Sequence, residues 1–589
     1  MVFSVNGVDG GWALTLQILN GRWFMMFASA LIMSVAGATY IFGLYSNNLK
    51  SSLGYDQTTL LLLSFFKDLG ANVGILPGLI NEVTPPWVVL SMGVVLNFFG
   101  FFMVWLAVTS RIARPQIWHM CLYIFVGSNS QAFANTGSLV TCVKNFPESR
   151  SVVLGLLKGF LGLSSAIITQ LYHGIYGAEN ASALILLIAW LPPTISIVFL
   201  RTIRIIRVAP QPPNELQVFH KFLYLSLALA GFLLIVIVVQ KMVHFTRLEY
   251  VSSAVIVLIL LLLPITPVIK EEYSIWKSKK QAATVPAQLK ISTETPTAPP
   301  TEQEVPVSCF KDVFRPPERG EDYTIFQALF SIDMLIIIFA SICGIGGTLT
   351  AVDNLGQIGA SLGYPSRSIS TFVSLISIWN FLGRVVAGFA SEILQTKYKF
   401  PRPLLLTVVL FFSCIGYILI AFNVWNGLYV ATIIIGFCLG AQYPLLLTII
   451  SEIFGLKYYS SLSNFGVAAC PVGSYVLNVI VTGGLYDEQA EKQMKALGLA
   501  AKGNNNNMDC KGEECFKLAF IIITAVTVAG ALGSAILVLR TWKFYRSDVN
   551  KKFREEGVET EAEVVEMETT AAENGDERPA RGHSKIDDC

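Results

Sequence analysis

The sequence predicts an all-α integral membrane protein with about 14 transmembrane helices. Of its 589 residues, 53% are hydrophobic and only 14% are charged, whereas soluble domains carry charge on about a quarter of their residues. Apolar stretches of about 20 residues recur along the chain, and each is long enough as a helix to cross a hydrocarbon core about 30 Å thick. These stretches are continuously apolar rather than alternating, so helices, and not the strands of a closed barrel, are the expected spans.

The expected spans fall into three groups. The first group lies near residues 22–45, 58–80, 87–108, 117–142, 152–173 and 183–203. Two additional spans follow near 220–240 and 250–269. The last group lies near 331–355, 368–391, 404–422, 427–449, 461–483 and 516–540.

These groups define six predicted domains. In order, they are an N-terminal segment at 1–21, a first six-helix bundle at 22–207, two additional helices at 208–270, a linker at 271–322, a second six-helix bundle at 323–546 and a tail at 547–589. The N-terminal segment has the apolar side chains Trp12 and Leu16, which are typical of a membrane interface. The linker is rich in Pro, Thr, Lys and Glu and the tail is acidic and poor in apolar residues, so both are predicted to be disordered.

The distribution of Lys and Arg over short loops predicts the orientation, because these residues resist translocation. If the N-terminus is cytosolic, the inside loops hold the cluster Arg201, Arg204 and Arg207, and the end of the last span is followed by several more basic residues up to Arg554. The loops on the other side hold fewer. Both termini are therefore predicted to be cytosolic, in a multi-pass protein of either the plasma membrane or the vacuolar membrane.

The ten cysteines show no spacing typical of metal ligands, so no metal is expected. Cys510 and Cys515 are the only cysteines of the long loop at 486–515, which the orientation places on the non-cytosolic side. They either form a disulfide, if that compartment is oxidising, or remain free thiols.

The first and last groups of spans resemble each other, which indicates a duplication. Ser52-Leu-Gly-Tyr55 follows the first span and Ser361-Leu-Gly-Tyr364 follows the ninth, 309 residues later (361 minus 52). Two like-oriented bundles joined by a linker are an architecture in which one half rocks against the other around a site at the membrane midplane. The alternative is a shared packing rule for small residues in apolar helices, although the loop match lies outside any helix interface.

A group of glycines and charges in the second bundle predicts a cytosolic gating motif. It consists of Gly383, Arg384, Gly388 and Glu392 and is followed by Lys397, Lys399 and Arg402. Glycines let two helices approach closely, and the charged groups can latch neighbouring helix ends until the halves rock. The first bundle retains only Gly78 and Glu82 of this pattern. A helix end that merely satisfies the preference for inside positive charge is the alternative.

Lys67 and Asp68 lie about ten residues into the second span, near the bilayer centre. A charge at that depth costs about 3 kcal/mol or more, so each must face a wet cavity or a partner. Adjacent residues point about 100° apart on a helix, and we therefore expect that the two do not neutralise each other. Either they handle a solute or proton, or they form structural ion pairs.

Further polar residues are candidates for the pathway. Lys158 lies about two turns into the fifth span, where it either meets Asp68 or an anionic solute, or extends its long stem to the cytosolic interface. Asn129 and Gln131 in the fourth span, and Gln442 in the corresponding span of the second bundle, either line a pore or bond between helices.

Several functional classes lack support in the sequence. No phosphate-binding loop ending in Gly-Lys-Ser/Thr is present, which disfavours a built-in ATP motor, and no catalytic motif indicates an enzyme. No cofactor is expected, and the weak net charge of +2 gives no reason to expect nucleic acid. The expected partners are a small-molecule solute and the lipid bilayer, and the sequence indicates no protein partner.

Four segments carry a family resemblance: Tyr40-Ile-Phe-Gly-Leu-Tyr-Ser46, Lys50-Ser-Ser-Leu-Gly-Tyr-Asp-Gln57, Phe66-Lys-Asp-Leu-Gly-Ala-Asn-Val-Gly74 and Pro85-Pro-Trp87. They resemble the plant nodulin-like family of the major facilitator superfamily. Members look like carriers with a nodulin-like first half and a second half similar to oxalate/formate and monocarboxylate antiporters. The resemblance implies a major-facilitator-type pair of six-helix bundles with two extra spans between them in a plant membrane, and it includes Lys67 and Asp68 in a family motif.

The sequence thus supports a gradient-driven secondary transporter of a small solute that works by alternating access. An organic anion such as a monocarboxylate is slightly favoured, because Lys67 and Lys158 place positive charge at depth. The competing hypothesis is a membrane receptor or scaffold that keeps a transporter fold without transporting.

Overall fold

A computed structural model describes residues 6–55, 57–177, 181–206, 215–243, 245–282, 316–424, 426–496, 510–547 and 549, and within these ranges all regular secondary structure is helical. The predicted disorder of the central linker and the acidic tail falls for the most part outside the described residues. The part of the linker prediction that can be compared differs at its start, since helix α13 continues to Ala282, beyond the expected boundary at residue 270.

The first half of the chain is built from short and long helices in the following order: α1 (Asn6–Asn20), α2 (Arg22–Ala36), η1 (Ala38–Ile41), α3 (Phe42–Leu53), α4 (Gln57–Asn72), α5 (Ile75–Val83), α6 (Pro86–Val108), α7 (Ile117–Ala134), η2 (Asn135–Val140), α8 (Thr141–Asn145), α9 (Arg150–Tyr176) and α10 (Ala181–Val198). The additional helices are α11 (Glu215–Met242), α12 (Arg247–Leu262) and α13 (Ile265–Ala282).

The second half follows the same plan: α14 (Ile325–Leu329), α15 (Ile332–Asp353), α16 (Leu355–Ser361), α17 (Ser366–Tyr398), α18 (Arg402–Ala421), α19 (Gly427–Ile453), α20 (Tyr459–Ser474), η3 (Tyr475–Gly483), α21 (Gly484–Ala496) and α22 (Glu514–Arg546).

Within the described ranges, ten helices are long and apolar enough to cross a membrane. They coincide with ten of the 14 predicted spans. The other four predicted spans contain the broken helix α4 and α5, the series α7, η2 and α8, the shorter helix α10, and the more polar helix α17. The finding supports a multi-pass helical membrane protein, and the count of 14 remains a prediction.

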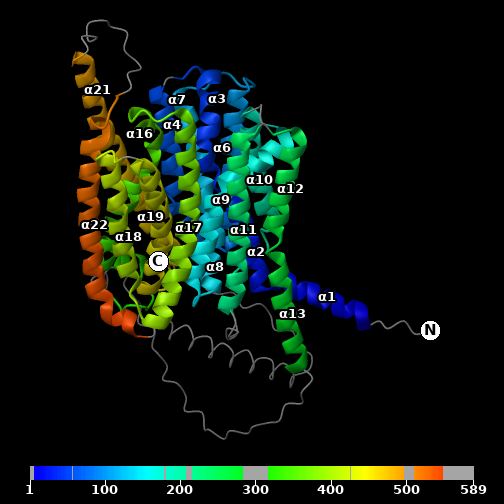
Figure 1. Cartoon of the computed structure of the whole chain (residues 1–589). Helices are drawn as coiled ribbons and strands as arrows, with labels where there is room; N and C mark the ends of the chain where they lie inside the picture. The colour runs from blue at the N-terminus through cyan, green and yellow to red at the C-terminus, as the bar shows by residue number, and fades with distance from the viewer. Residues whose placement is uncertain are drawn as a thin grey trace.

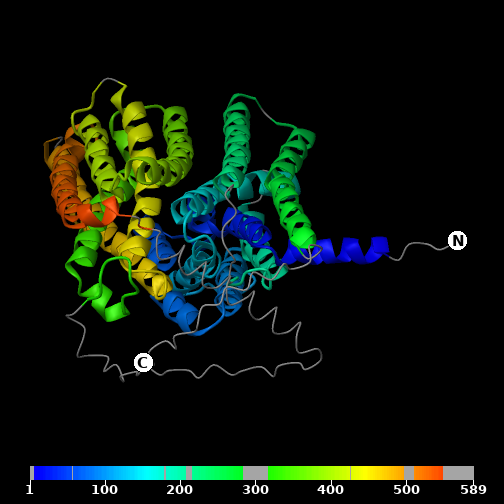
Figure 2. The same cartoon turned by 90° about the horizontal axis from the view of Figure 1, so that it is seen from below.

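The helices stand side by side in two bundles (Figure 1). α11 and α12 pack against α9 of the first half and stand apart from the rest of the molecule when the bundle is seen from below (Figure 2). α1 and the lower end of α13 lie at one end of the bundle, called the inner end here, and α21 lies at the opposite, outer end (Figure 1).

The sequence of α10 shows how an apolar span tolerates helix breakers. Pro192 and Pro193 lack the amide hydrogens that would pair with carbonyls one turn earlier. The side chain of Asn97 on α6 donates instead to the carbonyls of Ile188 and Ala189, at 2.9 and 3.3 Å. This contact removes the cost of unpaired backbone groups in a lipid environment and fixes α6 against α10.

Candidate functional site

A buried lysine lies at the interface between the two halves. Lys158 of α9 is only 6% exposed, and its Nζ donates to Oδ1 of Asn135 at 3.3 Å. The Nζ atom also lies 5.8 Å from the ring centre of Tyr443 on α19. The side chain of Lys158 therefore points into the interface between the halves. It neither extends to the cytosolic end nor contacts Asp68, the two alternatives that the sequence left open.

A second cation faces the same region from the other half. Arg384, midway along α17, is 2% exposed and donates through Nη1 to the backbone carbonyl of Lys158 at 2.6 Å. Its Nη2 lies 3.4 Å from the hydroxyl of Tyr40, whose side chain is 47% exposed. Within the described ranges no carboxylate pairs with either Lys158 or Arg384. Two positive charges thus meet at the interface without an acidic counter-ion.

A small polar cavity adjoins Lys158. It is lined by side chains of both halves, and its polar members are Asn72, Asn135, Thr136, Lys158, Ser463 and Asn464. Asn464 of α20 donates to Oγ1 of Thr136 at 2.8 Å, so one hydrogen bond already crosses the cavity between the halves. The arrangement provides one cation and several amide and hydroxyl groups to a small cavity, a chemistry suited to a small anionic solute.

Below this cavity, glycines bring the backbones of α9 and α17 together. A Cβ atom added to Gly388 would lie 2.7 Å from the carbonyl oxygen of Ser151 and 2.8 Å from Cα of Gly155. The hydroxyl of Ser151 donates to the carbonyl of Gly388 at 2.8 Å. Gly383, on the same helix, faces the backbone of Phe437 on α19 within the second half. The two glycines of the predicted gating motif therefore have different partners.

A buried group of charges closes the inner end of this interface. Arg402 contacts Glu392 at 2.9 Å and Glu452 at 2.7 Å. Arg150, at the start of α9 in the first half, donates to the carbonyl of Ser451 at 3.2 Å and lies 4.0 Å from Glu452. The contacts of Arg150 cross between the halves, so this charge cluster joins them at the inner end.

A second contact across the inner end uses the remnant motif of the first half. Oε1 of Glu82 accepts from the backbone amide of Ser461, in the first turn of α20, at 3.1 Å. A carboxylate is favoured at a helix N-terminus, where amides are free and the dipole is positive. Two further residues of α5 contact Ser460 of α20. Gly78 lies beside the backbone of Ser460, and the side chain of Asn81 donates to its hydroxyl at 2.7 Å.

Lys67 and Asp68 contradict one expectation. Lys67 Nζ lies 2.9 Å from Asp68 Oδ1, so the two adjacent charges do pair. The expectation was wrong because the 100° rotation per residue fixes only the direction of Cβ, whereas the lysine stem has four carbons and bends back along the helix.

The polar candidates of α7 serve mainly to hold helices together. Asn129 donates to the carbonyls of Gly70 and Val73, where α4 ends and α5 has not yet begun. Gln131 accepts from the hydroxyl of Thr39 at 2.7 Å. Gln442 is 1% exposed and packs beside Gly344 inside the second half, with no hydrogen bond to its amide among the described residues. None of the three lines the cavity at Lys158.

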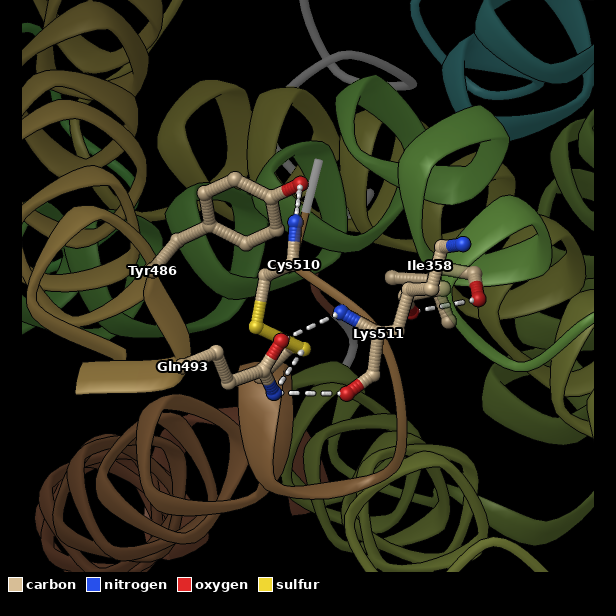
Figure 3. The surroundings of a disulfide bond; sticks show 7 residues. Ile358, Tyr486, Gln493, Cys510 and Lys511 are labelled. Atoms are coloured by element: carbon tan, nitrogen blue, oxygen red, sulfur yellow. Dashed lines mark hydrogen bonds between the residues drawn. A yellow bond between two sulfur atoms is a disulfide. The ribbon is translucent and has the colours of Figure 1, made fainter. Parts of the chain in front are cut away.

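The structure joins Cys510 and Cys515 in a disulfide at the outer end (Figure 3). The side chain of Gln493 on α21 makes two hydrogen bonds to the backbone of Lys511, the residue after Cys510. It donates to the carbonyl of Lys511 at 2.7 Å and accepts from its amide at 3.0 Å. The hydroxyl of Tyr486 accepts from the amide of Cys510 at 3.0 Å. The bridge thus holds the end of the long loop against α21.

Sequence reasoning missed several of the residues that make the interface. Arg150 and Glu452 stand in different halves and have no local pattern that connects them. The sequence marks Tyr443 only as the neighbour of Gln442 and Tyr40 only as part of a family motif, and it does not single out Asn464. A search for amide side chains within the predicted spans would have found Asn464, near the start of the span at 461–483. In the described ranges, no group of three His, Cys, Asp or Glu residues is arranged to hold a metal ion.

Comparison with known proteins places this geometry in context. Residues 22–269 match the family model described as Nodulin-like, and residues 323–547 match the model described as NFD4, C-terminal domain. Over 550 residues the chain is 23% identical to Protein NUCLEAR FUSION DEFECTIVE 4 of Arabidopsis thaliana, which covers 90% of this chain and 91% of that protein. Over 185 residues it is 26% identical to Probable transporter MCH1 of Yarrowia lipolytica, which covers 30% of this chain and 35% of that protein.

Solved structures give the same fold. The proton:xylose symporter XylE bound to 6-bromo-6-deoxy-D-glucose superposes with a TM-score of 0.52 at 13% identity, covering 90% of this chain and 96% of the symporter. A double Trp XylE mutant gives a TM-score of 0.50 at 12% identity, with coverages of 91% and 97%. At such identities the similarity carries the fold and not the solute.

Proposed function

Since this chain belongs to the nodulin-like family and has a major-facilitator transporter fold, we propose that it carries a small organic anion across a membrane by alternating access. A monocarboxylate is the favoured solute. The two halves of the proposed carrier are the bundles at 22–207 and 323–546, joined by a cytosolic linker, with both termini in the cytosol. The plasma membrane and the vacuolar membrane are the two candidate locations.

The observation that carries the proposal is the pair Lys158 and Arg384. The two side chains come from different halves, are almost fully buried and have no acidic partner in the described part of the chain. An uncompensated charge in a membrane interior costs several kcal/mol. A bound carboxylate would offset that cost for both cations at once, which makes anion binding at this interface favourable.

The same pair supports alternating access. Because Lys158 belongs to the first half and Arg384 to the second, an anion held by both couples the two halves. The inner end is closed by the contacts of Arg150 and Glu82 with α19 and α20. Tyr40, which contacts Arg384, is 47% exposed and lies in η1, between α2 and the helix α3 at the outer end (Figure 1). The proposed state is therefore outward-facing.

The test is uptake of radiolabelled carboxylates by vesicles that contain the purified protein. A charge-assisted hydrogen bond contributes about 1.5–3 kcal/mol. Lys158→Gln and Arg384→Gln are therefore each expected to weaken apparent affinity by about 10- to 150-fold. Lys397→Gln is the matched control, because Lys397 is exposed at the inner end of α17 and should leave uptake unchanged.

Two results would contradict the proposal. The first is saturable carboxylate uptake that is equal in wild type, Lys158→Gln and Arg384→Gln. The second is a wild-type protein that neither transports any carboxylate nor gains thermal stability from one, because a ligand of the native state must raise its stability. The second result would favour a receptor or scaffold that only retains the fold.

A further inference from the structure

A second charged cluster lies between the halves, nearer the outer end than Lys158. Lys67 and Asp68 pair on α4, and the side chain of Asp68 is 41% exposed. Asp353, the last residue of α15 in the second half, is also exposed. The rings of Phe65 on α4 and Tyr475 on η3 lie 5.7 Å apart between centres, so the two halves are in contact here, and the Asp353 carboxylate interacts electrostatically with both Lys67 and Asp68. Two carboxylates from opposite halves therefore face a single lysine.

The cluster lies in the outer part of both halves. Lys67 is ten residues from the start of α4 at Gln57, which corresponds to about 15 Å along a helix. Asp353 is the last residue of α15 and precedes the short helix α16 (Leu355–Ser361), which lies toward the outer end (Figure 1). The contacts of Arg150 and Glu82 close the inner end, so the outer end is the route by which water would reach the two exposed carboxylates.

The neighbours of Asp353 hold it in place without neutralising it. Nδ2 of Asn478 on η3 donates to Oδ2 of Asp353 at 3.3 Å, and Nδ2 of Asn354 donates to Oδ1 of Asn478 at 2.6 Å. The charged groups that act on Asp353 are Lys67 and Asp68, and Lys67 also interacts with the Tyr40 phenol. The cluster thus has one cation, two carboxylates and a net charge of −1.

We propose that Lys67, Asp68 and Asp353 form the outer gate of the pathway, and that closing this gate binds one proton on Asp353. The inference rests on the proposed carrier function. Closure brings the outer ends of α4 and α15 together and removes water from both carboxylates. One lysine can neutralise only one of them, so the second carboxylate must either gain a proton or keep the gate open.

The step is balanced as a protonation. The Asp353 carboxylate takes one proton from the outer aqueous phase and becomes a neutral carboxyl group, while the ion pair of Lys67 and Asp68 stays intact. A metal cation fits this site less well, because the Lys67 ammonium group already pairs with Asp68 and would repel a second cation. The proposal therefore names the proton as the ion that gates the outer end.

The test measures gate closure directly and needs no identified solute. Spin labels are attached to cysteines that replace Ser52 and Ala360, which are exposed near the outer ends of α3 and α16. The remaining cysteines of the described residues are buried or in the disulfide, and Cys309 and Cys589 are replaced by serine. Distances between the labels are recorded from about pH 8 to about pH 5, with sodium and with potassium as the only alkali cation.

Uptake of one proton predicts that the ratio of closed to open molecules rises by up to about tenfold per pH unit. Asp353→Asn mimics the protonated group, so this variant should populate the short distance at every pH. Asp487→Asn is the control, because Asp487 is an exposed acid of α21 outside the cluster and should keep the wild-type pH dependence.

The possible outcomes separate the gate from the carrier. If Asp353→Asn keeps the wild-type pH dependence, or if wild-type closure follows sodium instead of pH, the proton gate is wrong. If a carboxylate ligand of the wild-type protein changes the distances but pH does not, the gate fails while the carrier function stands. If neither pH nor any carboxylate changes the distances, both fail.

Discussion

The contact between α9 and α17 at Gly388 gives a quantitative test of how the inner end closes. The substitution is Gly388→Ala, which adds a single Cβ atom. That atom would lie 2.8 Å from Cα of Gly155, whereas an ordinary contact begins at 3.4 Å, so the two helices must separate by about 0.6 Å. The atoms on both sides of the contact are backbone atoms, which cannot move aside as a side chain can.

Overpacking of this kind costs about 1–3 kcal/mol. The cost falls only on the state in which the inner end is closed, so the ratio of open to closed molecules should rise by about 5- to 150-fold. Spin labels at positions 201 and 396, both exposed at the inner end, report this change as a shift toward longer distances.

The matched control is Gly231→Ala on α11, where an added Cβ atom would meet no atom within 4 Å. This variant should give the wild-type distance distribution. If Gly388→Ala gives the same distribution as Gly231→Ala, the α9 and α17 contact does not hold the inner end closed, and the account of the seal is wrong.

Two further predictions concern stability. Arg402→Ala leaves two buried carboxylates without their shared partner, so it should lower the free energy of unfolding by about 3–5 kcal/mol. The control Lys397→Ala should change the free energy of unfolding by less than about 0.5 kcal/mol. Thermal unfolding in nanodiscs compares the two variants, and equal midpoints would refute the role of the cluster. Replacing Cys510 and Cys515 together by serine opens a loop with a sequence separation of five, which should cost about 2 kcal/mol. A reducing agent should have the same effect on the wild type and none on the double variant.

Much of the helical framework could be predicted from apolar length alone. Ten predicted spans coincide with long apolar helices because a membrane sets a minimum length that no soluble core repeats. The additional helices α11 and α12 were found in this way as well. The break between α4 and α5 could not be predicted, because it depends on a residue of another helix. The side-chain amide of Asn129 on α7 donates to the carbonyls of Gly70 and Val73, which the break leaves without a helical partner.

The position of Lys158 along its helix could be predicted from the sequence, but its contact with Arg384 could not. The sequence put Lys158 about two turns into a span expected at 152–173, and the structure has it eight residues after Arg150, where α9 begins. Arg384 was grouped with Glu392 by its glycine pattern, yet the two lie eight residues, or about 12 Å, apart along one helix. That distance takes Arg384 away from the inner charge cluster and brings it to Lys158. The contact joins residues 226 positions apart, which no local pattern reveals.

The central claim is that Lys158 faces a cavity that opens to each side of the membrane in turn. The most direct measurement is the reaction of Lys158→Cys with a water-soluble thiol reagent, applied to sealed vesicles from one side at a time. The six native free cysteines of the described residues are buried and give the background. The account predicts reaction from the outer side in the wild-type background, and faster reaction from the inner side when Gly388→Ala is added. Absence of reaction from both sides in both backgrounds would contradict it.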